Sequence, residues 1–447
     1  MANEIPDKVS REEAEAALES WVREAVDTVD VVDVHTHLFP PSHGPLMSWG
    51  IDALLTYHYL VAELFVAAAN PPPEHEFFKL SSQNQADLIW EELFVRRSPI
   101  SEACQGVLTT LRILGLHEEI RNRDLKAIRA WFAEQDPEVY TEHVFRTARV
   151  RYCVMTNIPF VDEEVEQWQN LNAAKSWSKR FKAAVRVDPI LKGDWATIEA
   201  SLRKQGFSPT IRGAREFLKS WSEKTDAIYF MASTPNNFAY SPTKFCGCEG
   251  AQQEDDDQGP CTSDVASELI DRVLVPTALE LKFAIAVKIG ACRGLNPKLN
   301  PCGGGDGVEV ADLTPLATMC RQYTKLKILI TVLSRDNQHE LTVMANKFGR
   351  QLHVYGCWWY CNNPSIIDDV TRMRLEILGT AFTAQHSDAR VLDQLLYKWT
   401  HSRRVISEVL VDKYRELYRT GWVLTQKEVN RDVGRLFGDA FEEFLAR

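Results

Sequence analysis

Two histidines, His35 and His37, stand one residue apart at the end of the apolar run 31–34. Alternate side chains of a β-strand point to the same face, so two imidazoles with this spacing can hold one metal ion. Imidazole suits zinc, iron, nickel or copper, and such a site usually needs a further ligand, most often a carboxylate. The chain has 11 histidines, so the spacing alone can arise by chance and its surroundings must decide.

The composition is that of an ordinary globular protein, with 45% hydrophobic and 25% charged residues among 447. A net charge of −11 argues against nucleic acid or a membrane surface as a partner. We expect no membrane span, because no apolar stretch approaches the ~18 residues required. The polar, acidic start lacks the features of a signal peptide, and ten scattered cysteines then predict reduced thiols in the cytoplasm.

Short β-branched or apolar runs alternate with helix-like stretches along most of the chain, which predicts a parallel sheet. Eight such units predict an α/β fold of the (β/α)8 barrel type, with its active site at the carboxyl ends of the strands. A doubly wound open sheet is the competing architecture, but no glycine-rich phosphate loop follows the first strand. The predicted strands lie near 29–35, 149–155, 182–187, 226–231, 283–290, 326–332, 351–356 and 379–385. The predicted helices cover 163–175, 195–204, 265–281, 313–323, 340–348 and 364–378.

Three segments depart from this alternation. Residues 1–28 are predicted to form a helix before a barrel domain over 29–447, which closes with helices from Ser407 onward. The interval 40–148 is interpreted as a helical insertion after the first strand that serves as a lid. The acidic segment 245–262 is expected to be a surface loop. A small metal site there is the weaker alternative, because no second CxxC accompanies its three cysteines. The helical patterns of the insertion lie at 51–65, 83–94, 101–114 and 122–132, and the cysteines are Cys246, Cys248 and Cys261.

The last strand leads into a run that contains Asp388 and Arg390. In a metal barrel an aspartate here completes a His-His-Asp ligand set and can take a proton. The guanidinium of Arg390 suits a substrate carboxylate, because its donors form a fixed fork. Arg186 and Arg293 follow two other strands, and three arginines near strand ends in an acidic protein indicate an anionic small molecule.

Aromatic residues offer weaker evidence of a pocket. Trp358 and Trp359 follow the seventh strand, where they either line the pocket or pack in the core. The pair His58-Tyr59 lies in the helical insertion, where both residues could act as proton donors if the insertion folds over the barrel mouth.

The chain resembles the uronate isomerases of the amidohydrolase superfamily over nearly its whole length. The resemblance implies that His35 and His37 bind the metal with Asp388, and that His58 and Tyr59 lie over the substrate. It rests on these two pairs and on further segments that keep the family's order. These are Val185-Arg186-Val187-Asp188, Ile289-Gly290-Ala291-Cys292-Arg293, Leu333-Ser334-Arg335-Asp336-Asn337, Gly356-Cys357-Trp358-Trp359-Tyr360, Ser387-Asp388-Ala389-Arg390 and Arg403-Arg404.

Part of the implied substrate shell differs. Lys288 replaces the family's histidine before Ile-Gly-Ala, and Ala62 and Phe65 stand where arginines usually follow His-Tyr. Three states of Lys288 are open: a cation paired with an acid, which we favour, a neutral base, or a carbamate that ligates the metal. As a cation it would bind substrate.

The resemblance implies an aldose–ketose isomerase that moves a proton between C1 and C2 of a hexuronate such as glucuronate or galacturonate. Asp388, Tyr59 and His58 would be catalytic. The alternative is a metal-dependent hydrolase of a lactone, ester or amide. One divalent metal is expected, zinc first, with manganese, iron or cobalt as alternatives. The expected partner is a small, anionic, sugar-acid-like substrate, and the protein could form a homo-oligomer. The implied substrate-binding residues are Arg186, Arg390, Arg293, Trp358, Trp359 and Lys288.

Overall fold

The computed structural model describes residues 10–242 and 255–446. The chain divides into two compact units. Unit 1 comprises Met1–Val34, Trp49–Tyr152 and Tyr355–Arg447, and unit 2 comprises His35–Ser48 and Cys153–Val354. Two of the three cysteines considered for a small metal site, Cys246 and Cys248, lie outside the described residues.

A mainly parallel sheet runs through unit 2 in the order β1-β2-β3-β4-β5-β7-β8, and β6 pairs antiparallel with β5. The fold is a distorted (β/α)8 barrel, as predicted. Every residue of β5 except the last is buried, which is typical of a parallel strand covered on both faces. The strands are β1 (Val31–Thr36), β2 (Val150–Asn157), β3 (Phe181–Arg186), β4 (Ala227–Pro235), β5 (Ala284–Cys292), β6 (Gly307–Val308), β7 (Ile328–Val332) and β8 (Leu352–Val354).

The strand predicted near 379–385 is not formed, and this prediction was wrong in its extent. A single parallel bridge, between Tyr355 and Thr383, stands in its place. The backbone N–H of Ala384 donates to the carbonyl of Leu436 in the C-terminal helical region instead of to a strand. Because backbone groups in this segment find partners outside a ladder, no continuous eighth strand develops.

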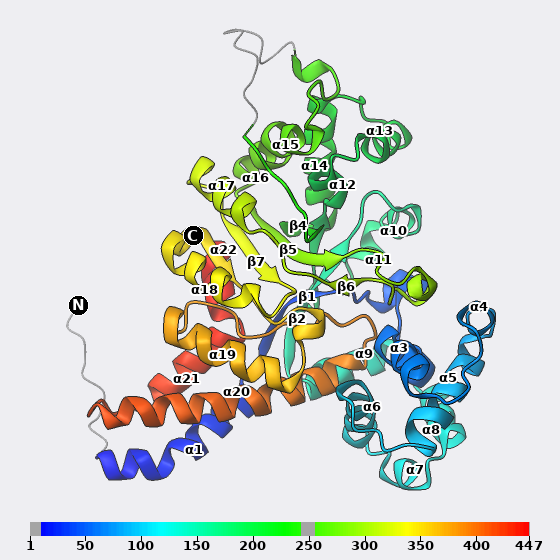
Figure 1. The fold of residues 1–447 in the computed structure, drawn as a ribbon, viewed down its shortest axis with the longest axis vertical. Helices are drawn as coiled ribbons and strands as arrows, with labels where there is room; N and C mark the ends of the chain where they lie inside the picture. The colour runs from blue at the N-terminus through cyan, green and yellow to red at the C-terminus, as the bar shows by residue number, and fades with distance from the viewer. Residues whose placement is uncertain (1–9, 243–254, 447) are drawn as a thin grey trace. The chain divides into compact units, whose positions relative to one another are not determined.

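Helices in unit 2 follow the strands and cover the sheet. Helix α14, which the sequence reasoning missed, packs on β3 and β4 (Figure 1). The helix predicted at 163–175 is two shorter helices: the first ends at Gln167, and the side chain of Asn170 caps the start of the second. The helices of unit 2 are α10 (Asp162–Gln167), α11 (Leu171–Ala174), α12 (Asp188–Lys192), α13 (Trp195–Lys204), α14 (Ile211–Thr225), α15 (Val265–Leu269), α16 (Val275–Leu281), α17 (Thr314–Gln322) and α18 (Asn337–Phe348). Shorter turns are η1 (Pro41–Leu46), η3 (Asp255–Asp257), η4 (Ile270–Leu274), η5 (Pro297–Cys302) and η6 (Gly349–Gln351).

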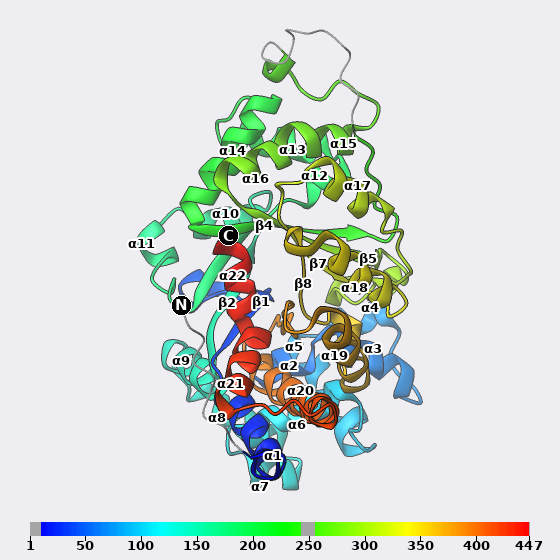
Figure 2. The ribbon, with the colours of Figure 1, turned by 90° about the vertical axis from the view of Figure 1, so that its left-hand side faces the viewer.

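Unit 1 is helical outside the strand segments. Its longest helix, α20, packs against α1, α6 and α19, and begins well before the predicted start at Ser407 (Figures 1 and 2). The helices are α1 (Arg11–Thr28), α2 (Ile51–Leu55), α3 (His58–Ala67), α4 (Glu74–Phe77), α5 (Ser82–Trp90), α6 (Glu102–Ile113), α7 (His117–Asn122), α8 (Leu125–Ala133), α9 (Pro137–Thr147), α19 (Pro364–Leu378), α20 (Gln394–Arg419), α21 (Gln426–Gly434) and α22 (Ala440–Ala446). Shorter turns are η2 (Glu91–Val95), η7 (Trp359–Cys361) and η8 (Arg435–Asp439).

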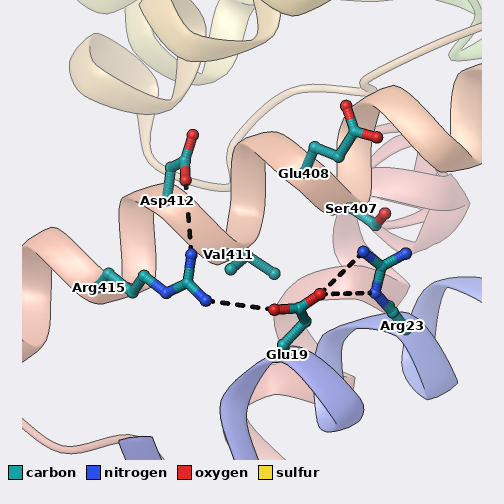
Figure 3. Close-up of a pocket in the computed structure, with 7 residues that line it drawn as sticks. All are labelled: Glu19, Arg23, Ser407, Glu408, Val411, Asp412 and Arg415. Atoms are coloured by element: carbon teal, nitrogen blue, oxygen red, sulfur yellow. Dashed lines mark hydrogen bonds and ion pairs between the residues drawn. The ribbon is translucent and has the colours of Figure 1, made fainter.

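The surface between α1 and α20 carries an ion-pair network. Glu19 on α1 accepts from Arg23 at 2.9 Å and from Arg415 on α20 at 3.2 Å (Figure 3). These side chains are about half exposed, so the ion pairs add little stability. The shallow pocket that they line joins the two helices, and we assign it no function.

The segment Pro41–Ala67 passes a length and composition test for a membrane span, with a mean hydropathy of 1.2, so the expectation that no stretch qualifies was too strict. The segment is not one helix. Gly50, with φ 92°, precedes α2, and Tyr57 is extended before α3. Half of its most apolar window is buried within the protein. A spanning helix needs ~20 consecutive helical residues, which this segment lacks.

Candidate active site

His35 lies near the end of β1 and His37 directly follows the strand, both in unit 2. Thr36, between them, donates its hydroxyl to the carbonyl of Val154, while Thr156 donates to the carbonyl of Thr36. These bonds hold Thr36 towards β2 and so fix the strand's register. The two imidazoles are edge to face with ring centroids 5.0 Å apart, and His35 is buried. The structure therefore brings together the two histidines that the alternation predicted.

Lys288 lies beside this pair. It is buried in β5, and its Nζ is 2.7 Å from Nε2 of His35. An ammonium can only donate, so the imidazole nitrogen accepts. Nε2 of His35 is thus one hydrogen-bond neighbour of Lys288, and the pairing of Lys288 with an acid, which we favoured, stays a prediction. A metal on the same nitrogen would require the ammonium to move or to lose its proton.

Arg186 and Arg293, the two arginines of unit 2 that the sequence analysis selected, are both linked to Ser233. Arg186 makes two hydrogen bonds to Asp188, at 3.0 and 2.8 Å, and Asp188 also accepts from the N–H of Ser233 at 2.9 Å. Burial alone would raise the pKa of Asp188, but Arg186 and the N–H of Ser233 outweigh it and the pKa is lowered. Arg293 donates to Ser233 Oγ at 3.0 Å and pairs with Asp306. Both arginines are thus partly neutralised, and Arg293 keeps 41% of its side chain exposed.

In unit 1, two predicted site residues have strained backbones. Asp388 has φ 50° and Trp359 has φ 49°. The other described non-glycine residues with positive φ lie at or just after helix C-termini, where this conformation is usual. A bulky residue such as tryptophan rarely adopts positive φ. Strain of this kind persists only when its surroundings enforce it, and it clusters at functional sites.

An aromatic cluster in the same unit contains the predicted His58 and Tyr59. The His58 ring is 4.5 Å from that of Tyr59 and 5.9 Å from that of Trp359, measured between centroids. Tyr57, which sequence reasoning did not select, lies 4.3 Å from His58. The cluster is rich in buried polar atoms for which the described part of the chain provides no hydrogen-bond partner. They are both ring nitrogens of His58, the hydroxyls of Tyr57 and Tyr59, and Nε1 of Trp359.

Charged side chains act on this cluster. Burial, followed by the cation of Arg390, lowers the pKa of His58 to about 3, while Asp388 opposes this shift. The charge of Lys398 on α20 also lowers the pKa of His58, and Lys398 itself interacts with the charge of Asp388. His58 is therefore a neutral imidazole near neutral pH. Burial raises the pKa of Tyr59 well above its usual value, so its phenol keeps its proton.

A network of hydrogen bonds holds the segment that carries Asp388. Asp33 of β1 accepts from the N–H of Ser387 at 3.0 Å and from the indole of Trp399 at 2.9 Å. Gln394, at the start of α20, accepts from the N–H of Arg390 at 2.8 Å. Sequence reasoning treated Asp33 only as part of an apolar run. A charged residue inside a strand that is otherwise apolar was the available evidence for its role.

Trp358 is buried with 6% of its surface exposed, and its ring centroid lies 6.4 Å from that of Trp359. The indole of Trp359, by contrast, belongs to the aromatic cluster. Trp359 is just as buried, at 7%, so burial does not separate the two alternatives, and the role of each indole stays a prediction.

The donor types of a divalent metal site are present. Unit 2 supplies the imidazoles of His35 and His37, and unit 1 supplies the carboxylate of Asp388. Two imidazoles and a carboxylate fit zinc and related divalent metals. A (β/α)8 barrel that carries donors of these types is typical of metal-dependent barrel enzymes.

Comparison with known proteins identifies the family. No family model and no curated protein matches the chain. Among solved structures, a uronate isomerase from Bacillus halodurans is 40% identical, with 99% of this chain and 98% of that chain covered and a TM-score of 0.87. A uronate isomerase from Thermotoga maritima (17% identity, 96% and 97% covered, TM-score 0.75) shares the fold. So does a glucuronate isomerase from Caulobacter crescentus (14%, 99% and 97%, TM-score 0.69). The chain belongs to the uronate isomerase family.

Proposed function

We propose that this protein is a uronate isomerase that interconverts an aldose uronic acid, of the glucuronate or galacturonate type, and its ketose form. The observation that carries the proposal is the 40% identity to a uronate isomerase over nearly the full length of both chains. The histidine pair, the strained Asp388 and the neutral His58 supply the chemistry that such a reaction needs. The hydrolase alternative has no comparable support.

The proposed metal ligands are His35, His37 and Asp388, and zinc is the metal we expect first. When bound, the metal would polarise a substrate oxygen and stabilise the negative charge that develops on it. The donor set fits such an ion. In this structure, however, Nζ of Lys288 lies at hydrogen-bond distance from Nε2 of His35. Lys288 is thus proposed to move towards the substrate when the metal is bound.

The remaining roles follow from protonation states. His58 is neutral and Tyr59 is protonated, so both can donate a hydrogen bond to the carbonyl end of the substrate. Asp388 would carry the proton between the two carbons. Arg390 would bind the substrate carboxylate. Further contacts are proposed for Arg186, Arg293 and Trp359, and for Trp358 through packing against Trp359.

The direct test is incubation of metal-loaded protein with glucuronate and with galacturonate. We expect ketose formation and incorporation of solvent deuterium at C2. Variants His35→Ala and His37→Ala should lose both activity and stoichiometric metal. A lactone and ester panel serves as the comparison. Turnover of a lactone with no ketose formed from either uronate would reject the isomerase assignment in favour of a hydrolase.

We also propose a cytoplasmic location. The cysteines that the structure describes are all free thiols, which is typical of a reducing compartment. Assembly into a homo-oligomer stays a prediction, to be checked by sedimentation.

A further inference from the structure

The hydroxyl of Tyr57 is buried and has no hydrogen-bond partner within residues 10–242 and 255–446. Tyr57 keeps only 7% of its surface exposed. A buried hydroxyl without a partner is destabilising, so native proteins seldom keep one without a reason. Tyr140, a similarly buried tyrosine of the same unit, shows the usual solution: its hydroxyl donates to Asp393.

The position of Tyr57 is well defined. It is the residue before α3, and its carbonyl accepts from the N–H groups of Leu60 and Val61 at 2.9 and 3.2 Å. Its ring is held edge to face against His58 at 4.3 Å and Tyr59 at 5.1 Å. Because the backbone and both ring contacts fix this side chain, the hydroxyl cannot easily turn to another partner.

The charge that acts most strongly on Tyr57 is that of Arg390, followed by Asp388. Burial raises the pKa of Tyr57, so the phenol remains protonated and can donate. A guanidinium has donors and no acceptor, so it cannot accept the phenol proton. An anion is the ligand that satisfies a phenol and a guanidinium together.

We propose that Tyr57 is a further substrate-binding residue, whose hydroxyl donates to the substrate carboxylate held by Arg390. This inference rests on the proposed function, because it takes a sugar acid as the ligand. It assigns to Tyr57 a role in binding that is separate from the proton-handling roles of His58 and Tyr59.

The test is the Tyr57→Phe variant, with Tyr140→Phe as the matched control. For Tyr57→Phe we expect the Kd of the sugar acid gluconate to rise about tenfold, the size of one hydrogen bond to a charged group. The Kd of the neutral alditol sorbitol should not change, and KM for the uronate should rise with kcat nearly constant. The stability of Tyr57→Phe should be unchanged or higher, because an unpartnered hydroxyl is removed, whereas Tyr140→Phe should be less stable.

Different outcomes separate the two proposals. Equal weakening of gluconate and sorbitol, or a Kd for gluconate equal to that of the unmodified protein, would overturn the role of Tyr57. If the unmodified protein makes no ketose and yet binds gluconate tenfold better than Tyr57→Phe does, the carboxylate role stands and the reaction is wrong. In the double variant of Tyr57→Phe and Arg390→Lys, the Kd of gluconate should rise by less than the product of the two single-variant fold-changes, because both side chains donate to one carboxylate.

Discussion

Gly356, at the start of the segment that carries Trp359, is the position where the structure makes the sharpest stability prediction. Its φ is +61°, and an added Cβ would overlap Nδ1 of His386 and lie 2.7 Å from Cε1 of the same ring. The backbone cannot easily yield. The N–H of Gly356 donates to Thr383 at 2.9 Å, and its carbonyl accepts from the buried Arg374 at 2.8 Å.

Gly356→Ala should therefore lower the free energy of unfolding for two reasons. The left-handed backbone costs about 1–2 kcal/mol for a residue with a Cβ, and forcing the buried His386 ring to move costs about 1–3 kcal/mol more. Gly206→Ala is the matched control, because Gly206 follows the end of α13 in the left-handed conformation with φ +82° and nothing lies within 4 Å of the added Cβ. It should show the backbone cost alone, so Gly356→Ala should be less stable than the control by about 1–3 kcal/mol.

Urea unfolding of both variants measures this difference in the free energy of unfolding. Because His386 is two residues before Asp388, metal content and kcat/KM should also fall in Gly356→Ala and be retained in Gly206→Ala. Equal stability of the two variants would refute the reasoning, since it would show that the His386 ring moves at no cost.

Three further predictions concern single side chains. Arg390→Lys should lower kcat/KM for a uronate by about 2 kcal/mol in transition-state free energy despite the retained charge, because the two-pronged fork is lost; an unchanged value would mean that Arg390 points elsewhere. Lys288→Met should increase metal affinity in a chelator competition, because it removes a cation from His35; a loss of metal would instead support the carbamate ligand. Burial lowers the pKa of His43 to about 4, below the usual value near 6.5. The unfolded chain therefore takes up a proton that the folded chain does not, and stability falls as the pH drops from about 6.5 towards 4. His43→Gln should reduce the loss of unfolding free energy between pH 7 and pH 5, and an unaltered slope would show that His43 does not contribute.

The strands that sequence reasoning found are those whose hydrogen bonds run to neighbouring strands. Buried parallel strands such as β5 form apolar runs of their own, bounded by helices, so their existence can be predicted locally. The segment near 379–385 is also rich in apolar and β-branched residues, but the N–H of Ala384 donates to the carbonyl of Leu436. That partner lies more than fifty residues away, and local patterns contain no information about it.

The candidate site likewise contains residues that local sequence patterns predict and residues that they do not. His35 and His37 could be predicted because strand alternation alone puts them on one side, and the Thr36 bonds show why the register holds. Asp33 and Tyr57 could not, because their importance depends on partners that the fold supplies or withholds: an indole and a backbone N–H for Asp33, and no protein group among the described residues for the hydroxyl of Tyr57.

The backbone gives evidence that is independent of the sequence reasoning. Asp388 and Trp359 were chosen for their chemistry, without any knowledge of their conformation. They are also the described non-glycine residues whose positive φ no helix end explains. Each such conformation costs of order 1–3 kcal/mol, so the surrounding contacts must enforce it. For Asp388 those contacts include two hydrogen bonds: the N–H of Ser387 donates to the carboxylate of Asp33, and the N–H of Arg390 donates to the side chain of Gln394. Hydrogen bonds on either side of Asp388 thus hold its backbone in a conformation that it would not adopt alone. The carboxylate that we propose as metal ligand and proton carrier is in this way preorganised.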